Sequence, residues 1–312
     1  GLTNPQGHDD KSRNLRQINM GISTAGQGIL FRLCFARSPT VINHYTVEVG
    51  RFILHGPAKS DYNCRSTLDC IITIRGTGFT VTNGLMIKSG TSKCDGPDTA
   101  TIFGPGFTNP ALPAATPKDI DAPLGNMQVS FNLEVAITSD PTAKYYTCWS
   151  SHFYSESFNV QVGTLLIGGA IPDVYSCWSG TPCSPLIRGR LLDQTSKLAI
   201  VSGDSCSSDG VVQFDSSSGI RNPAQIEQEQ QTYSSQRGGN EIQFSFGDVV
   251  YVDPSRVFLL CFAFEDESGN SQFLSEVQDS FHFRGLQFGD YECTMGASCA
   301  PTFSGLKKIV HV

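Results

Sequence analysis

The side chains with the most chemical potential in this sequence are its cysteines, which recur at regular intervals. The eleven lie at positions 34, 64, 70, 94, 148, 177, 183, 206, 261, 293 and 299. Cysteines can bind zinc, act as nucleophiles or pair as disulfides. Each C-x5-C pair lacks a second pair or a histidine in register, so it is a poor set of tetrahedral zinc ligands. The spacing therefore favours disulfides.

The short-range pairing is simple, because each C-x5-C pair can close a small loop. We expect disulfides between Cys64 and Cys70, between Cys177 and Cys183, and between Cys293 and Cys299. By loop-closure entropy, each short link would contribute roughly 2 kcal/mol and each longer link roughly 4 kcal/mol.

The longer pairing depends on where each repeat begins. A boundary just after Gly50 and Gly163 pairs Cys94 with Cys148 and Cys206 with Cys261, and leaves Cys34 unpaired within the chain. A boundary at each Asn-Pro turn instead pairs Cys34 with Cys94 and Cys148 with Cys206, and leaves Cys261 over. An intermolecular bridge is a third reading of the odd cysteine count. We favour the first boundary.

No other group of residues indicates catalysis or ligand chemistry. The histidines at 8, 44, 55, 152, 282 and 311 do not recur in register with the cysteines. No Gly-x-Ser-x-Gly, His-Glu-x-x-His, Walker or Cys-x-x-Cys motif occurs. Asp140-Pro141 and Asp253-Pro254 offer one recurring carboxylate, too few for calcium, and predict turns. We expect no catalytic residue, no cofactor and no metal, and we do not expect an enzyme.

The elements that position the cysteines form a repeat. Cys34, Cys148 and Cys261 are separated by 114 (148 − 34) and 113 (261 − 148) positions, and their neighbours recur as Phe-Arg-Leu-Cys-Phe, Tyr-Tyr-Thr-Cys-Trp and Phe-Leu-Leu-Cys-Phe. A Gly-x-x-Asn-Pro turn recurs at 1–5, 106–110 and 219–223. A fixed period of this kind indicates a tandem array.

Within one repeat the segments are short, apolar or alternating, and rich in β-branched and aromatic residues. Residues 71–74, 85–87, 129–137, 145–149 and 158–162 predict strands, with turn residues between them. No segment predicts an amphipathic helix, and the polar run 225–231 is interpreted as an exposed loop. About seven strands per repeat fit an all-β sandwich of two sheets.

The favoured boundary predicts four parts, with repeats of about 113 residues. Residues 1–52 would be the C-terminal part of one repeat, 53–165 and 166–281 two whole repeats, and 282–312 the start of the next. The alternative boundary gives three domains, the last one truncated.

Composition indicates the cellular setting. The net charge is −7 and no lysine- or arginine-rich run occurs, so nucleic acid is not expected as a partner. Eleven cysteines favour an oxidising, extracellular or cell-surface location. The longest apolar run, 163–171, is too short to span a membrane, and the chain does not start with a signal peptide, so export is expected to be encoded elsewhere in a longer protein. Serine- and threonine-rich segments at 99–116 and 202–218 are compatible with O-linked sugars.

Two resemblances follow from these motifs. Residues 70–79 (CIITIRGTGF), with 85–87 and 158–163, resemble the strand-Gly-x-Gly-Phe-strand pattern of IPT/TIG immunoglobulin-like domains. The whole array, with its Tyr-x-Cys and Leu-Cys-Phe/Trp strands, resembles cysteine-containing repeat proteins that single-celled eukaryotes export to their surface or to flagellar hairs (mastigonemes). The extra cysteines and the Gly189-Arg-Leu-Leu192 segment depart from the IPT/TIG pattern.

The second resemblance implies a structural role. We expect a segment of a long extracellular protein that forms the shaft of a surface filament or flagellar hair. Its partners would be other copies of itself or sister filament subunits. The alternative is a cell-surface adhesin or receptor ectodomain, with a binding loop in 94–127 or 206–241 of one repeat.

Overall fold

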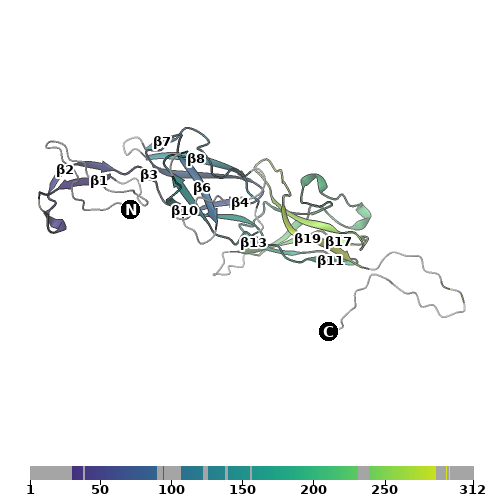
Figure 1. Cartoon of the computed structure of the whole chain (residues 1–312). Coiled ribbons are helices and arrows are strands. Elements are labelled where there is room, and N and C mark those ends of the chain that lie inside the picture. Colours follow the sequence, from purple (N-terminus) through teal and green to yellow (C-terminus); the bar gives the residue numbers. More distant parts are fainter. Residues whose placement is uncertain are drawn as a thin grey trace.

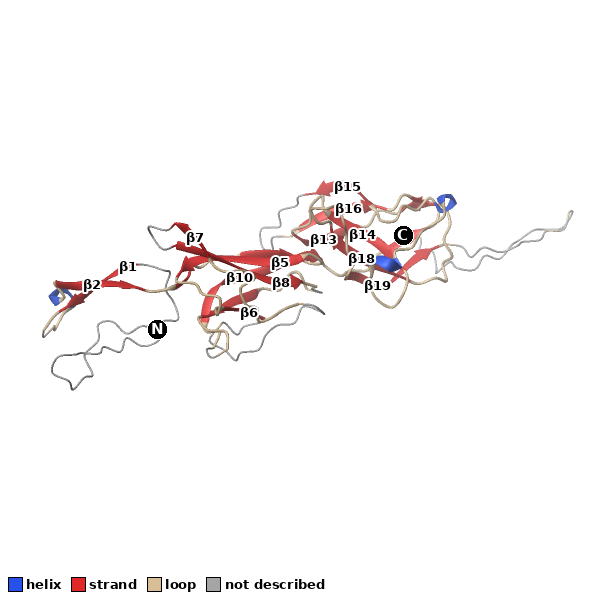
Figure 2. Ribbon diagram, turned by 90° about the horizontal axis from the view of Figure 1, so that it is seen from above, coloured by secondary structure: helices blue, strands red, loops and turns tan. Residues whose placement is uncertain are grey.

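The described strands form a hairpin and two β-sandwiches that follow one another in a row (Figures 1 and 2). The computed structural model describes residues 30–37, 39–89, 94, 107–121, 126–137, 140–154, 157–230, 239–285, 293 and 295. Figures 1 and 2 show, in two views, a hairpin at one end, followed by a first and then a second group of sheets. The units follow one another along the chain, and the molecule is elongated.

The hairpin consists of β1 (Leu30–Phe35) and β2 (Val47–Ile53). Phe35 lies opposite Val47 and Cys34 opposite Glu48, and the register shifts between Leu33 and Cys34. The connecting loop contains the short 3-10 helix η1 (Ile42–His44). Within the described residues, these two strands form a sheet of their own.

The first sandwich follows directly. Its strands are β3 (Gly56–Pro57), β4 (Tyr62–Arg65), β5 (Asp69–Thr77), β6 (Gly84–Ser89), β7 (Lys118–Asp121), β8 (Asn126–Val135), β9 (Tyr145–Ser150) and β10 (Val160–Ala170). One sheet has the order β3-β5-β8-β7, and the other has β6-β9-β10 with β4 parallel to β10. This is the ABED and CFG strand order of the immunoglobulin fold.

The core of the first sandwich lies between its two sheets. In β5 buried and exposed side chains alternate, so that Ile72 and Ile74 face inward while Ile71 is 59% exposed. Phe131 of β8 packs with them, and Leu85 and Trp149 cover them from the opposite sheet. The period of two along the strand follows from the pleat of the backbone.

The second sandwich repeats this order. Its further strands are β11 (Ser176–Trp178), β12 (Thr181–Pro182), β13 (Leu186–Arg190), β14 (Ser196–Val201), β15 (Gln225–Gln230), β16 (Asn240–Ser245), β17 (Asp248–Val249), β18 (Phe258–Phe264) and β19 (Ser275–Arg284). One sheet is β15-β16-β13-β10, the other is β11-β19-β18-β14, and β12 pairs with β17. The short 3-10 helices η3 (Ser208–Gly210) and η4 (Ser216–Ser218) lie between β14 and β15.

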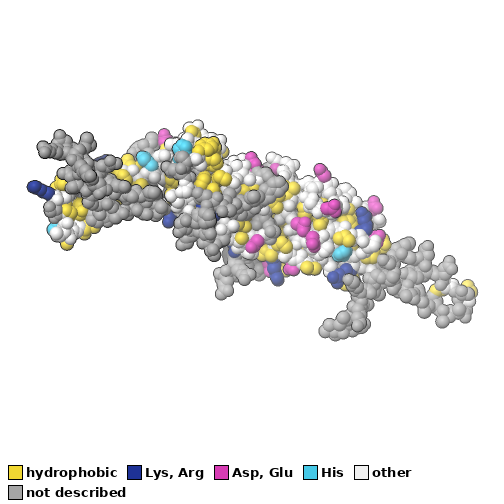
Figure 3. Space-filling model, viewed as in Figure 1, with side chains coloured by type: hydrophobic (Ala, Val, Ile, Leu, Met, Phe, Trp, Pro, Cys, Tyr) yellow, Lys and Arg dark blue, Asp and Glu magenta, His cyan; other side chains and the backbone are white. Residues whose placement is uncertain are grey.

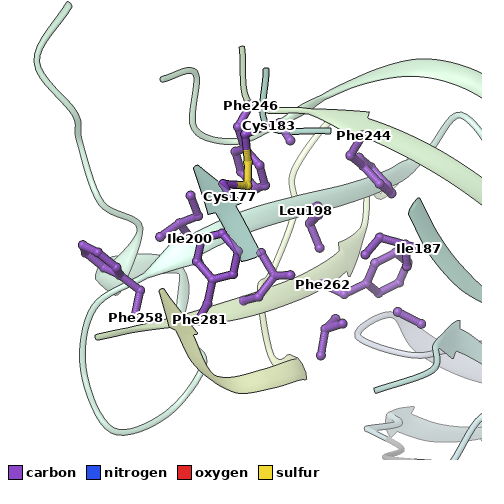
Figure 4. Close-up of a cluster of buried hydrophobic side chains, with 14 of the residues drawn as sticks. Cys177, Cys183, Ile187, Leu198, Ile200, Phe244, Phe246, Phe258, Phe262 and Phe281 are labelled. Atoms are coloured by element: carbon purple, nitrogen blue, oxygen red, sulfur yellow. A yellow bond between two sulfur atoms is a disulfide. The ribbon is translucent and has the colours of Figure 1, made fainter. Parts of the chain in front are cut away.

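Phenylalanines fill the second core. Phe258, Phe262 and Phe281 lie around Leu198 and Ile200, and Phe244 and Phe246 cover them from the other sheet (Figure 4). The Cys177–Cys183 disulfide lies beside Phe246 (Figure 4). Phe258 and Phe283 meet edge to face at 6.0 Å, an arrangement that aromatic rings favour.

The longer disulfides lie outside these cores. Cys148 and Cys261 point to the outer face of their sheets, where they bond Cys94 and Cys206. There Met86 and Phe158 pack around the first disulfide, and Ala199 and Phe273 around the second. Each long disulfide therefore attaches a loop to the outside of a sheet, whereas the antibody disulfide joins two sheets through the core.

The structure confirms the all-β, immunoglobulin-like, disulfide-bonded fold expected from the sequence. The interpretation of 225–231 as a loop is wrong, because 225–230 form the edge strand β15, which pairs with β16. An edge strand needs only one backbone partner, and Ile226 attaches β15 to the core. Among the described residues, no helix has the length and apolar character to cross a membrane.

Candidate functional site

The feature that sets this molecule apart from two separate domains is the junction between its sandwiches. Strand β10 belongs to both. Its residues 160–168 pair with β9 and β4 of the first sandwich, and Gly169 and Ala170 pair with β13 of the second. One continuous strand thus replaces a linker, and ladder hydrogen bonds on either side of the junction restrain its backbone.

Arg65 holds the two sandwiches together from the side. It ends β4 and lies in the loop closed by the Cys64–Cys70 disulfide. One guanidinium nitrogen lies 2.5 Å from an Asp193 carboxylate oxygen and another donates to the Thr195 hydroxyl at 2.9 Å. The group also lies 5.2 Å from the centre of the Phe264 ring. The planar guanidinium suits this combination of an ion pair and a ring contact.

The acceptors of Arg65 are held in place before it binds them. The other Asp193 oxygen accepts from the Thr195 backbone nitrogen at 2.9 Å and from its hydroxyl at 2.6 Å. Arg65 and Asp193 are 37% and 34% exposed, so the pair is partly shielded from water. We therefore expect it to contribute about 1 kcal/mol, near the upper range for surface pairs.

Thr67 provides a second, buried contact. Its backbone is left-handed (φ 70°), which is unusual for a β-branched residue, and its side chain is 1% exposed. The backbone nitrogen donates to the Ala136 carbonyl at 2.8 Å within the first sandwich. The hydroxyl accepts from the Phe264 nitrogen of the second sandwich at 3.1 Å. A strained residue is thus retained where its side chain bridges two domains.

A close-packed pair occurs at the same place on each sandwich. A Cβ atom on Gly168 would lie 2.7 Å from the Leu191 Cβ, and one on Gly78 would lie 2.3 Å from the His55 ring. These positions correspond under a shift of 113 (168 − 55 and 191 − 78). Each pair combines one glycine with one larger side chain, but in opposite order. Strand β10 is continuous past Gly168, whereas β2 ends at Ile53 and β3 begins at Gly56, so the two connections differ in backbone as well as in packing.

The cysteines lie in the hairpin, in both sandwiches and after β19. Cys64 of β4 pairs with Cys70, and Cys177 of β11 pairs with Cys183. Cys94 pairs with Cys148 and Cys206 with Cys261. Cys34 is exposed and free. Cys293 is disulfide-bonded, and its expected partner Cys299 lies outside the described residues.

Two partly buried tyrosines, Tyr62 and Tyr175, occupy equivalent positions two residues before the first cysteine of each short disulfide. Burial, together with the charge of Asp61, raises the pKa of Tyr62 to about 12. Burial likewise raises the pKa of Tyr175 to about 12, with Asp173 adding to the effect. Both hydroxyl groups therefore hold their protons more tightly than a fully solvated tyrosine does.

The geometry gathers no catalytic or metal-binding set in the described part of the chain. His44 lies in η1 and His282 in β19, and His55 and His152 lie in two different loops. His8 and His311 lie outside the described residues. No group of three His, Cys, Asp or Glu side chains there could hold a metal ion. Asp140 and Asp253 each accept from the residue two positions on, Thr142 and Ser255, as turn residues do. Figure 3 shows acidic side chains scattered singly over the visible face of the second sandwich.

Sequence reasoning did not identify the junction residues Arg65, Thr67, Asp193 and Thr195. The ion pair spans 128 positions, so no local pattern reveals it. Comparing the two repeats gives a weak signal that these positions are special, because Trp178 stands in register with Arg65 and Gly180 with Thr67. Gly180 has φ 84°, which shows that the backbone at this position is left-handed in both repeats.

Comparisons with known proteins add little to this picture. No family model matches the chain, and no curated protein matches it. Among solved structures, the polymeric immunoglobulin receptor ectodomain of a teleost fish is similar over 74% of this chain and 98% of that chain, at 11% identity and a TM-score of 0.20. A likeness at this level is too weak to support a shared function.

Proposed function

We propose that this chain is a structural segment of a long extracellular repeat protein, in which rigidly joined sandwiches form the shaft of a surface filament or of a mastigoneme-like flagellar hair. The observation that carries the proposal is the junction, where β10 runs through both sandwiches and Arg65 and Thr67 bridge them. A shaft needs a fixed angle between successive units, and this junction has no flexible linker.

The proposed division into repeats cuts β10, the strand that both sandwiches share. Residues 53–165 and 166–281 form whole repeats, 1–52 the end of a preceding one and 282–312 the beginning of the next. Disulfides inside each repeat resist unravelling under load and favour an oxidising, extracellular setting. Lateral partners would be other copies or sister filament subunits, and O-linked sugars would be carried by the loop 202–218.

Electron microscopy of the protein in its native, unreduced state tests this role. We expect a regular polymer whose axial repeat equals a whole number of sandwiches. Isolated flexible rods would contradict the shaft. They would favour an adhesin or receptor ectodomain, and the loops in 94–127 and 206–241 would then be screened for ligands.

Small-angle X-ray scattering on the 312-residue chain tests the rigidity separately. We expect a pair-distance distribution that fits one fixed arrangement of the two sandwiches. A distribution that requires many interdomain angles would remove the observation on which the proposal rests.

A further inference from the structure

The hairpin of β1 and β2 presents an apolar face to solvent. Phe31, Leu33 and Phe35 of β1 and Val47 and Val49 of β2 are 42%, 40%, 52%, 55% and 55% exposed. Side chains at every second position of a strand share a face, so these residues form one contiguous patch. Contiguous apolar surface on a soluble protein marks an interaction site.

The same hairpin occurs in the first sandwich with its face covered. Tyr145, Thr147, Trp149 and Val162 stand in the positions of Phe31, Leu33, Phe35 and Val49 and are 6%, 0%, 7% and 0% exposed. Val160, in the position of Val47, is partly buried against the same core. The registers agree, since Phe35 lies opposite Val47 as Trp149 lies opposite Val160, and both pairs of strands contain a bulge at the same point. The exposed face is therefore the inner face of a sandwich.

The outer face of the hairpin gives an independent indication. Cys34 stands where Cys148 stands in the first sandwich, where Cys148 is bonded to Cys94. Cys34 itself is free and exposed. Cys64, Cys70, Cys94, Cys148, Cys177, Cys183, Cys206, Cys261 and Cys293 are all disulfide-bonded. None of these nine is thus available to pair with Cys34.

We propose that the hairpin 30–53 is a docking surface for an immunoglobulin-type half-sandwich, whose cysteine forms a disulfide with Cys34. The occupant supplies the opposite sheet, with apolar residues in the places of Ile72 and Phe131. It also supplies a strand equivalent to β6, followed by a cysteine in the place of Cys94. Disulfide formation oxidises the two thiols, and the S–S bond of a thiol–disulfide oxidant of the secretory compartment breaks as it takes up the two electrons and two protons to become a dithiol. The inference rests on the proposed tandem array.

The test is a disulfide map of the protein taken from its native source, with free thiols blocked before denaturation and no reduction. We expect Cys34 in a disulfide with a cysteine whose flanking sequence matches none of the eleven cysteines of this chain. Recovery of Cys34 in the blocked, free form would overturn the proposal. So would a bond from Cys34 to Cys34 of a second copy, which would indicate a hairpin dimer.

Hydrogen exchange on the same material tests the apolar face itself. Amides of β1 and β2 should be protected to within about ten-fold of those in β9 and β10, and they should exchange at least a hundred-fold faster in the isolated 312-residue chain. Equal exchange of the hairpin in both samples would count against the docked half-sandwich. Filaments in which Cys34 is free would refute the docking surface and leave the proposed shaft standing. Isolated rods in which Cys34 is bonded to an external cysteine would support the docking surface and contradict the shaft.

Discussion

At the scale of single residues, the junction depends on a few side chains that cross between the sandwiches. Replacing Arg65 by alanine removes the ion pair to Asp193, the hydrogen bond to Thr195 and the contact with the Phe264 ring. We expect the free energy of unfolding to fall by about 1 kcal/mol and the scattering curve to indicate a wider range of interdomain angles.

Arg188→Ala is the matched control for that substitution. Arg188 pairs with Glu241 at 2.7 Å within the second sandwich and does not bridge the junction. The Arg188→Ala substitution removes one positive charge from the chain, as Arg65→Ala does. If both variants broadened the scattering equally, the effect would be one of net charge, and Arg65 would have no special role.

Thr67 tests whether the junction needs a hydroxyl. Thr67→Gly suits the left-handed backbone but loses the acceptor of the Phe264 amide, whereas Thr67→Ser keeps it. We expect hydrogen exchange at Phe264 to accelerate about five-fold in the glycine variant, the equivalent of a 1 kcal/mol hydrogen bond. The serine variant should exchange at the wild-type rate. Identical acceleration in both would show that packing of the threonine methyl group is what matters.

The partly buried tyrosines Tyr62 and Tyr175 predict that stability falls at alkaline pH. Because burial raises the pKa of Tyr62 and Tyr175 to about 12, the folded state holds these protons more tightly than the unfolded state does. The unfolded state ionises first, near its ordinary pKa of about 10, so stability should fall as the pH rises from about 10 to about 12.

Urea unfolding at several pH values, with absorbance at 295 nm to follow ionisation, measures this dependence. The double variant Tyr62→Phe, Tyr175→Phe should show a flatter profile above pH 10, since phenylalanine cannot ionise. An unchanged slope in that variant would assign the alkaline loss to other groups.

At the scale of elements, the two kinds of disulfide should differ in their contribution to stability. The Cys94–Cys148 link closes 54 positions and the Cys64–Cys70 link closes 6. Loop-closure entropy gives about 4 kcal/mol for the first and about 2 kcal/mol for the second. We expect serine substitution of both Cys94 and Cys148 to lower the free energy of unfolding of the first sandwich more than serine substitution of both Cys64 and Cys70 does. Thermal denaturation measures the difference.

Cys34→Ser is the control for this comparison, because Cys34 is exposed and free in the chain. It should leave the unfolding of both sandwiches unchanged. A larger loss from the short link than from the long one would contradict the entropic account. It would indicate that the short link acts by holding the Arg65 loop against the second sandwich.

The strands themselves differ in how far the sequence predicts them. The alternation in β5 is visible in the residues, because Cys70, Ile72 and Ile74 must face a core while their neighbours need not. In β15 it is not visible, because a polar edge strand is held by backbone hydrogen bonds that any side chain permits. The junction residues also escape prediction, because their contacts join positions more than a hundred residues apart.

At the scale of the whole molecule, rigidity depends on the continuity of β10. Strand pairing continues from Leu165–Gly168 with β4 directly to Gly169–Ala170 with β13, so the backbone has no free residues between the sandwiches. Inserting Gly-Ser-Gly-Ser between Gly168 and Gly169 should leave both cores folded and free the angle between them. Scattering should then show a broader distribution, and the protein should no longer form a regular polymer.

The same four residues inserted after Gly269 provide the matched control. Gly269 lies in the exposed turn between β18 and β19, with φ 82° and a hydrogen bond to the Asp266 carbonyl, and surface turns of this kind accept insertions. That variant should keep the wild-type scattering and still assemble. If the β10 insertion also kept a fixed interdomain angle, then Arg65 and Thr67 alone would suffice to fix it. The continuous strand would then be a consequence of the tandem arrangement and not the source of its stiffness.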